Sequence, residues 1–228
     1  MKRPIESDYT SQVAYTRALE EYCEAFAKLV AEAEREACAK VCETQEDKGG
    51  MIQQCFTVDD FKIIIKEVCD NLPSSKYDVG QKVISELCSK LLEQVSAAYF
   101  TNKLGINVVA GRADVDPDNL FKFATGDVPL EIKVAQSMGS RVRFRGGSLS
   151  DRTSEYLFVS RNRECTEFFA ALAPMVKDDW VAQNTAYYAP YFTETMLYNK
   201  QVKILMGSFE TMTKGKRKGL PIINLEKI

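Results

Sequence analysis

Three side chains near the middle of the chain have the types and spacing needed for metal-assisted hydrolysis of a phosphodiester. Asp118 follows Pro117, and twelve residues separate it from the run Glu131-Ile132-Lys133. Two carboxylates can hold a hard cation such as Mg²⁺, which takes oxygen ligands and keeps several waters. A nearby ammonium can orient the attacking water or stabilise charge on the phosphate. The sequence therefore predicts a Mg²⁺ site with Asp118 and Glu131 as ligands and Lys133 as their catalytic partner.

The absence of histidine narrows the chemistry open to the chain. It excludes a Ser-His-Asp or Cys-His mechanism and a catalytic metal held by imidazoles. Hydrolysis by carboxylates, lysine and a bound cation needs no histidine at any step. The structural alternative is that Glu131 and Lys133 simply lie on a charged strand face that points to solvent.

Two predicted strands must position these side chains. A strand over 129–135 has apolar residues at its even positions, so Glu131 and Lys133 share the opposite face. A strand over 119–123 and a turn at 125–127 place Asp118 one hairpin upstream. Asp116 remains the alternative ligand because it alternates with Asp118, whereas Asp127 lies in the turn and is interpreted as structural.

Other elements follow from periodicity and from breaker residues. We expect an uninterrupted N-terminal helix over 11–46, ended by Gly49-Gly50, to form a helical arm. Thr57 and Asp60 resemble a capping box at the start of a second helix. The remaining expectations are helices over 57–72, 78–104 (stopped by Gly105) and 164–181, strands over 106–109, 156–160, 202–206 and 221–225, and a polar loop over 136–151.

From about residue 79 to residue 161 the chain resembles the core of type II restriction endonucleases. The family motif is PD…(D/E)xK, and the matching residues are Pro117-Asp118 and Glu131-Ile132-Lys133. The resemblance implies an α/β (α+β) fold, a mixed β-sheet flanked by helices, with a nuclease domain over 51–228 and the arm over 1–50. A glutamate from the preceding helix often assists the metal in this family. Glu86 is the first candidate here and Glu93 the second.

Basic residues cluster locally although the formal net charge is −2. Residues 133–152 carry five basic side chains and one acidic, and residues 200–218 carry six and one. Arginine suits phosphates and guanine edges, and such patches matter more for nucleic-acid contact than the overall charge. The predicted DNA-binding residues are Gln136, Ser137, Arg141, Arg143, Arg145, Lys214, Lys216 and Arg217. Solvated loops are the alternative interpretation of both basic segments.

Composition sets the remaining expectations. The chain has 228 residues, 45% hydrophobic, with seven cysteines and no CxxC pair, so we expect reduced, buried thiols, and a zinc site is only weakly supported. No apolar run approaches the ~20 residues of a membrane-spanning helix, and the start lacks a signal-peptide core. We therefore expect a cytoplasmic protein with no membrane partner, from a bacterial or phage setting.

These observations together favour a Mg²⁺-dependent endonuclease that cuts double-stranded DNA, as a sequence-specific type II restriction enzyme. A homodimer is expected, because two strands need two active sites and a palindromic site suits twofold symmetry. Two alternatives stay open. One is a nuclease of the same fold that nicks, repairs or resolves branched DNA. The other is a non-enzymatic phage interaction protein that uses the helical arm to bind a partner.

Overall fold

The structure is a computed structural model of the chain. It describes residues 21, 50–72, 80–111, 117–137, 141–146, 154–181 and 190–228. Apart from Glu21, the predicted arm over 11–46 lies outside the described residues, as does the alternative ligand Asp116. None of the described helices is long and apolar enough to cross a membrane.

Within residues 50–104 of the described chain, three helices precede the sheet: α2 (Met51–Cys55), α3 (Val58–Asn71) and α4 (Gln81–Leu104). The capping box predicted for α3 is confirmed, because Thr57 Oγ1 accepts from the Asp60 N–H at 3.2 Å and Asp60 Oδ2 accepts from the Thr57 N–H at 2.7 Å. Gly105 ends α4 in the left-handed region, with φ of 66°, as the sequence predicted.

Strands make up most of the remaining described chain. The main sheet contains β1 (Asn107–Ala110), β2 (Asn119–Phe123), β3 (Gly126–Gln136), β5 (Ser154–Arg161), β6 (Glu167–Met175), β8 (Lys203–Met206) and β11 (Glu226–Lys227). Two small ribbons lie apart from it: β4 (Arg143–Arg145) with β7 (Tyr191–Thr193), and β9 (Ser208–Thr211) with β10 (Pro221–Asn224). The short helices are η2 (Lys177–Asp179) and α5 (Glu194–Tyr198).

The main sheet is mixed and mostly antiparallel. Its order is β1-β2-β3-β5-β6-β11, and β8 also pairs with β6. β3 and β5 form the parallel pair, with Glu131 opposite Tyr156 and Lys133 opposite Phe158. All eight residues of β5 are buried, which confirms the central position predicted for the apolar strand over 156–160. The expected mixed sheet flanked by helices is therefore present.

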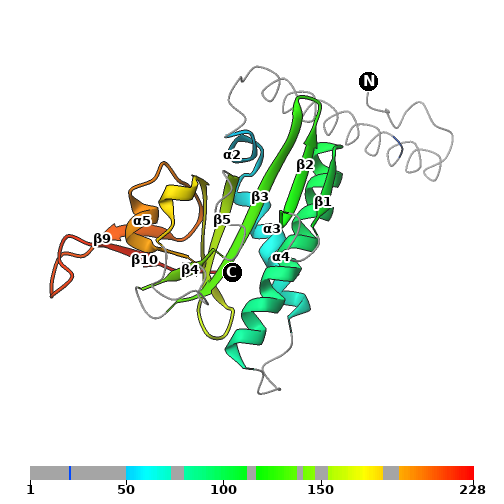
Figure 1. Ribbon diagram of the computed structural model, residues 1–228. Coiled ribbons are helices and arrows are strands. Elements are labelled where there is room, and N and C mark those ends of the chain that lie inside the picture. The colour runs from blue at the N-terminus through cyan, green and yellow to red at the C-terminus, as the bar shows by residue number, and fades with distance from the viewer. Residues whose placement is uncertain are drawn as a thin grey trace, which may run out of the picture.

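Each face of the sheet has its own apolar core. α3 and α4 cover one face, where Phe100, Phe121 and Leu157 lie in a continuous cluster. The opposite face is covered by the β4–β7 ribbon, α5 and β10, and its cluster includes Phe144 and Phe158. Figure 1 shows the two long helices on one side of the sheet and α5 with the small ribbons on the other. Glu131 and Lys133 belong to the second face.

The helix expected over 164–181 is wrong: this segment contains β6. Residues 168–173 read Phe-Phe-Ala-Ala-Leu-Ala and are all fully buried, so no polar face marks either a helix or a strand. Pairing with β5 on one side and β8 and β11 on the other decides the conformation. The loop expected over 136–151 also contains the short strand β4, which pairs with β7 about fifty residues later in the sequence.

Candidate active site

The site lies where β3 continues beyond the end of β2. Asn119, the first residue of β2, pairs with Leu130, so among the described strands residues 131–136 of β3 pair only with β5. Asp118 stands just before β2 and turns its carboxylate towards this open edge. Its Oδ2 accepts a hydrogen bond from the Ile132 backbone N–H at 2.6 Å. A charge-assisted bond of this kind fixes the carboxylate in one orientation.

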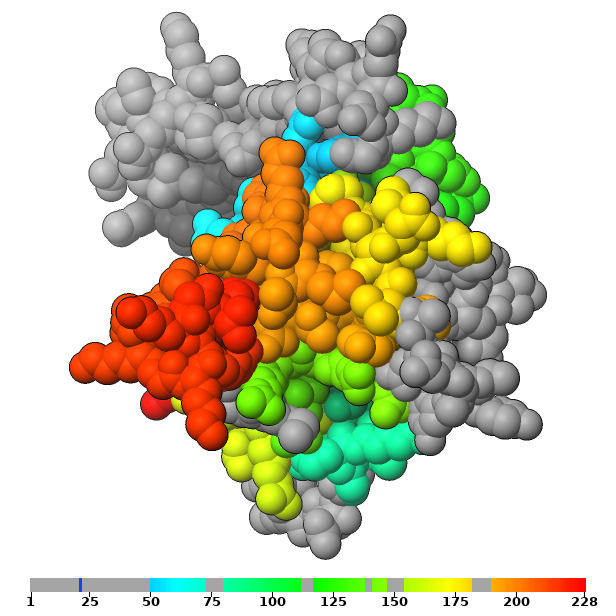
Figure 2. All heavy atoms as spheres, turned by 60° about the vertical axis from the view of Figure 1, so that its left-hand side comes forward, coloured from blue at the N-terminus to red at the C-terminus, as the bar shows by residue number. Residues whose placement is uncertain are grey.

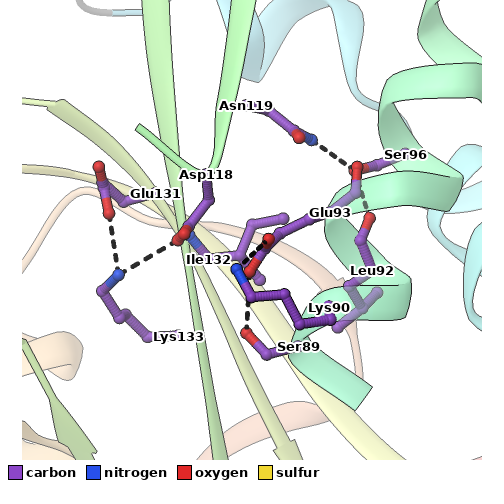
Figure 3. A network of polar contacts seen from close by, with 10 residues as sticks. All are labelled: Ser89, Lys90, Leu92, Glu93, Ser96, Asp118, Asn119, Glu131, Ile132 and Lys133. Atoms are coloured by element: carbon purple, nitrogen blue, oxygen red, sulfur yellow. Dashed lines mark hydrogen bonds and ion pairs between the residues drawn. The ribbon is translucent and has the colours of Figure 1, made fainter. Parts of the chain in front are cut away.

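The three residues of the predicted motif converge. Lys133 Nζ lies 2.9 Å from Glu131 Oε2 and 3.2 Å from Asp118 Oδ2. Figure 3 shows the ammonium between the two carboxylates. Strand alternation places Glu131 and Lys133 on the same face as predicted, and the hairpin brings Asp118 beside them. The side chains of Lys133 and Asp118 are 15% and 19% exposed and that of Glu131 only 1%. The group is therefore sheltered, and Lys133 and Asp118 are its solvent-accessible members, whereas Glu131 is buried.

The two carboxylates keep Lys133 charged. Burial opposes the charge, but attraction to Asp118 and Glu131 and the hydrogen bonds to both outweigh it, so the pKa of Lys133 is raised. The ammonium also lies over the Tyr156 ring, 5.7 Å from its centroid, on the neighbouring strand. At neutral pH the Lys133 side chain is thus a proton donor and a positive charge rather than a base.

A third carboxylate, Glu93 of α4, faces the same region. It is 2% exposed and accepts from Lys90 Nζ at 2.6 Å. Burial raises the pKa of Glu93, and the charge of Asp118 raises it further against the opposing effect of Lys90 and Lys133. Fully buried Asn119 contacts the Ser96 hydroxyl at 2.6 Å and so ties the start of β2 to α4 (Figure 3).

The structure separates the two glutamates considered for the helix. Glu86 has a side chain that is 64% exposed and pairs with Lys82 at 3.7 Å. Glu86 lines the same cavity as Lys133, near the N-terminal end of α4. Its catalytic role stays a prediction. Glu93, the second candidate, is the buried carboxylate that interacts electrostatically with Asp118. Glu93 lies seven positions after Glu86, and the sequence alone does not show which turn of α4 faces Asp118.

An open cavity of about 1510 Å³ joins the site to the surface. α4 forms one wall, and residues 132–136 of β3 with Asp118 form the floor. The opposite wall is built from the β4 segment and residues 193–195. The cavity is larger than a single cation needs, and its volume suits part of a polymeric substrate.

The predicted arginines lie on that opposite wall. Arg141, Arg143 and Arg145 are exposed, whereas Val142 and Phe144 between them are buried, so the alternation expected from the sequence is confirmed. The Arg143 guanidinium stacks on the Tyr191 ring at 3.7 Å from the centroid. All three arginines line the cavity that contains Lys133, which brings the basic face and the carboxylates into one site.

The other residues predicted to bind DNA are more dispersed. Gln136 lines the main cavity and, together with Ser137, a second one of about 440 Å³ beyond the end of β3. Lys214 and Lys216 are exposed in the β9–β10 loop. Arg217 in the same loop instead pairs with Glu194, at 2.7 Å between Nη2 and Oε1. Their contacts with DNA stay predictions.

The side chains present fit a hard divalent cation. Asp118 and Glu131 each place a carboxylate oxygen within 3.2 Å of Lys133 Nζ, and Mg²⁺ characteristically needs only one or two carboxylates because it keeps several waters. Among the described residues, no three Cys, Asp or Glu side chains form a ready-made metal cage. Cys55, Cys69, Cys88 and Cys165 are free thiols, which agrees with the expected reduced cysteines; the other three lie outside the described residues.

Comparison with known proteins adds no relative to this account. A scan against protein-family models found no matching family, and a search of curated proteins found no significant match.

Proposed function

We propose that the chain is a Mg²⁺-dependent endonuclease that hydrolyses phosphodiester bonds of double-stranded DNA. The observation that carries the proposal is the convergence of the Asp118 and Glu131 carboxylates on Lys133 Nζ, with Asp118 and Lys133 lining one open cavity and Glu131 buried beside them. A group placed only for stability has no need of a cavity with three exposed arginines on its opposite wall. The mixed sheet flanked by helices is compatible with the restriction-endonuclease resemblance of the motif.

Each residue has a distinct task in the proposed reaction. Asp118 and Glu131 hold Mg²⁺, which when bound lowers the pKa of a coordinated water and offsets charge on the phosphate. The Ile132 N–H keeps the Asp118 carboxylate aimed at the site. Lys133 Nζ, kept protonated by its two neighbours, donates hydrogen bonds to the attacking water or to a phosphate oxygen. Buried Glu93 lies behind Asp118, and the Asp118 charge helps to raise its pKa.

The exposed arginines support a polyanionic substrate. Arg141, Arg143 and Arg145 project from the wall opposite the carboxylates, where they can contact phosphates on either side of the scissile bond. A two-stranded ribbon such as β4–β7 is also narrow enough for the major groove of duplex DNA. Cutting at specific sequences and acting as a homodimer are the finer part of the proposal, and the motif resemblance supports them.

The test is digestion of unmodified plasmid and linear duplex DNA with the purified full chain, with Mg²⁺ or EDTA. We expect cleavage with Mg²⁺ alone, and discrete bands if the enzyme is sequence-specific. Asp118→Asn should abolish cutting, whereas the matched control Asp127→Asn should cut normally, because Asp127 is exposed near the start of β3 rather than in the turn where the sequence placed it.

The outcomes separate the candidate functions. Nicked circles with intact linear duplex would favour a nicking or repair nuclease of the same fold. Cleavage by Asp118→Asn at the wild-type rate would remove the proposed site. A wild-type chain that neither binds nor cuts DNA under any of these conditions would favour the non-enzymatic interaction protein.

A further inference from the structure

Another buried ion pair includes Glu194, which lines the same cavity as Asp118 and Lys133. Glu194, in the first turn of α5, has a side chain that is only 8% exposed. Its Oε1 accepts from Arg217 Nη2 at 2.7 Å, across 23 residues of sequence. The Arg217 side chain is 18% exposed, so it is turned into the protein although Lys214, Lys216 and Lys218 around it are exposed.

The same carboxylate also reaches the strand that carries the arginines. Glu194 Oε2 accepts from the backbone N–H of Val142 at 3.4 Å, between Arg141 and Arg143. One buried side chain thus links the β9–β10 loop, α5 and the start of β4. Removing one partner of a buried pair leaves an uncompensated charge, so loss of either Glu194 or Arg217 should loosen the contacts between the three elements.

Apolar contacts support the link. Phe209 of β9 lies against Tyr198 of α5, with ring centroids 5.6 Å apart, and Ile223 of β10 belongs to the same core as Phe144 of β4. Figure 2 shows the β9–β10 hairpin, in red, projecting beside the orange atoms of residues 190–205. The β9–β10 hairpin is therefore packed against the body of the protein, and its tip extends beyond the cavity.

We propose that Glu194 and Arg217 form a clamp that makes two separate basic segments into one binding surface for duplex DNA. The exposed cations of this surface are Arg141, Arg143, Arg145, Lys214, Lys216 and Lys218. Arg217 is then a positioning residue and contacts no phosphate itself. The inference rests on the proposed function, and it deepens that function by extending the DNA contact from the cavity wall to the β9–β10 tip.

The partner follows from the charge and form of this surface. Cations presented on two elements beside one cavity match a polymer with regularly spaced phosphates better than a single small anion. Such binding releases counter-ions, so the logarithm of the binding constant falls linearly with the logarithm of the salt concentration. The slope is about 0.9 for each phosphate contacted. Removing a cation that contacts phosphate lowers the salt slope directly. Removing a residue that only holds other cations in place lowers the slope because those cations move away from the phosphates.

The decisive experiment compares Arg217→Ala, Glu194→Gln and their double variant, with Lys216→Ala as the control for a direct contact. Affinity for a short fluorescent duplex is measured by anisotropy without Mg²⁺ over a range of salt. The clamp predicts that Arg217→Ala and Glu194→Gln each weaken binding by about tenfold, the scale of one charge-assisted hydrogen bond. The double variant should weaken it little further, because both changes break the same link.

A direct phosphate contact by Arg217 predicts the opposite for Glu194. Removing the carboxylate would then free Arg217, so Glu194→Gln would bind DNA as tightly as wild type or more tightly, and that result overturns the clamp. Hydrogen exchange without DNA gives an independent readout. The amide hydrogen of Val142 should exchange faster in Arg217→Ala and Glu194→Gln than in the wild type. Its exchange rate should be unchanged in Lys216→Ala.

The readouts keep the two proposals apart. If the wild-type chain cuts DNA but neither clamp variant changes exchange at β4, the clamp is wrong and the nuclease stands. If the wild-type chain binds no duplex at low salt, the proposed function falls, and the binding surface falls with it.

Discussion

Two of the described groups in which lysine meets a buried carboxylate differ in their charge balance and in their access to a cavity. In one, Asp60 accepts from Lys103 Nζ at 2.7 and 2.8 Å, from the Tyr99 hydroxyl at 2.6 Å and from the Thr57 N–H. In the other, Asp118 and Glu131 share the single ammonium of Lys133. The first group joins α3 to α4 and lines neither described cavity, whereas the second opens into the large one.

The direction of the pKa shifts reflects this difference. Burial acts to raise the pKa of Asp60, but the hydrogen bonds from Lys103, Tyr99 and Thr57 outweigh it, and the pKa is lowered. The pKa of Glu93, behind the second group, is raised by burial and by Asp118. A buried carboxylate that is paired with a cation and hydrogen-bonded, as Asp60 is, stabilises the fold. Excess negative charge beside a cavity is the condition for binding a cation, and it is retained at some cost in stability.

The largest expected effect concerns Lys133. Lys133→Met keeps much of the side-chain volume and removes the ammonium from the scissile phosphate. We expect the single-turnover rate of duplex cleavage to fall about 10³-fold, the scale found for removing one preorganised donor from an active site. DNA affinity, measured in EDTA, should change little. Cleavage within a factor of a few of wild type would show that Lys133 has no catalytic role.

The matched change in the other group should do the reverse. Lys103→Met leaves Asp60 buried without its cation, so the free energy of unfolding should drop by about 3 kcal/mol. The folded variant should cut DNA at the wild-type rate, because Lys103 lies outside the site. Urea denaturation and cleavage at low temperature measure the two quantities. A large loss of activity in a stable Lys103→Met protein would contradict the contrast between the groups.

Glu93→Gln should produce the smallest effect, and its sign depends on pH. Because the pKa of Glu93 is raised above 4.5, its contribution to stability is present below that pH and is lost as pH rises through the folded pKa. The neutral variant should therefore melt higher at pH 7–8, by about 2–4 °C if the net gain is about 1 kcal/mol. Near pH 4 the two proteins should melt together.

Asp60 provides the opposite pH dependence as a control within the same chain. Its pKa is lowered from 3.8, so its contribution is present above that value and is lost as pH falls through the folded pKa. Asp60→Asn should therefore lower the melting temperature at pH 7 and have progressively less effect in acid. A melting temperature of Glu93→Gln that falls at pH 7–8 would show that the Glu93 charge stabilises the apoprotein.

The central site could be predicted from the sequence because its geometry is local. Side chains two apart on a strand share a face, so Glu131 and Lys133 follow from alternation alone. Asp118 follows from the short hairpin that links its position to β3. Glu93 could not be chosen over Glu86 in the same way, because the contact between Asn119 and Ser96 fixes which turn of α4 faces Asp118, and that contact is tertiary.

Two other features depended on partners far away in the sequence. β6 has the composition of a buried helix and becomes a strand because neighbouring strands satisfy its backbone on both sides. Arg217 sits in a run of lysines that indicates a phosphate contact, yet it turns inward to Glu194. No local pattern marks Glu194 as the residue that needs a cation.

The central claim is that Asp118 and Glu131 hold one divalent cation, and Mn²⁺ titration followed by electron paramagnetic resonance tests it most directly. We predict that the wild-type chain and Asp127→Asn deplete the free Mn²⁺ signal equally. Asp118→Asn and Glu131→Gln should deplete this signal far less. Lys133→Met should bind Mn²⁺ at least as tightly as the wild type, because the competing ammonium is gone. Equal Mn²⁺ binding by wild type, Asp118→Asn and Glu131→Gln would contradict the account.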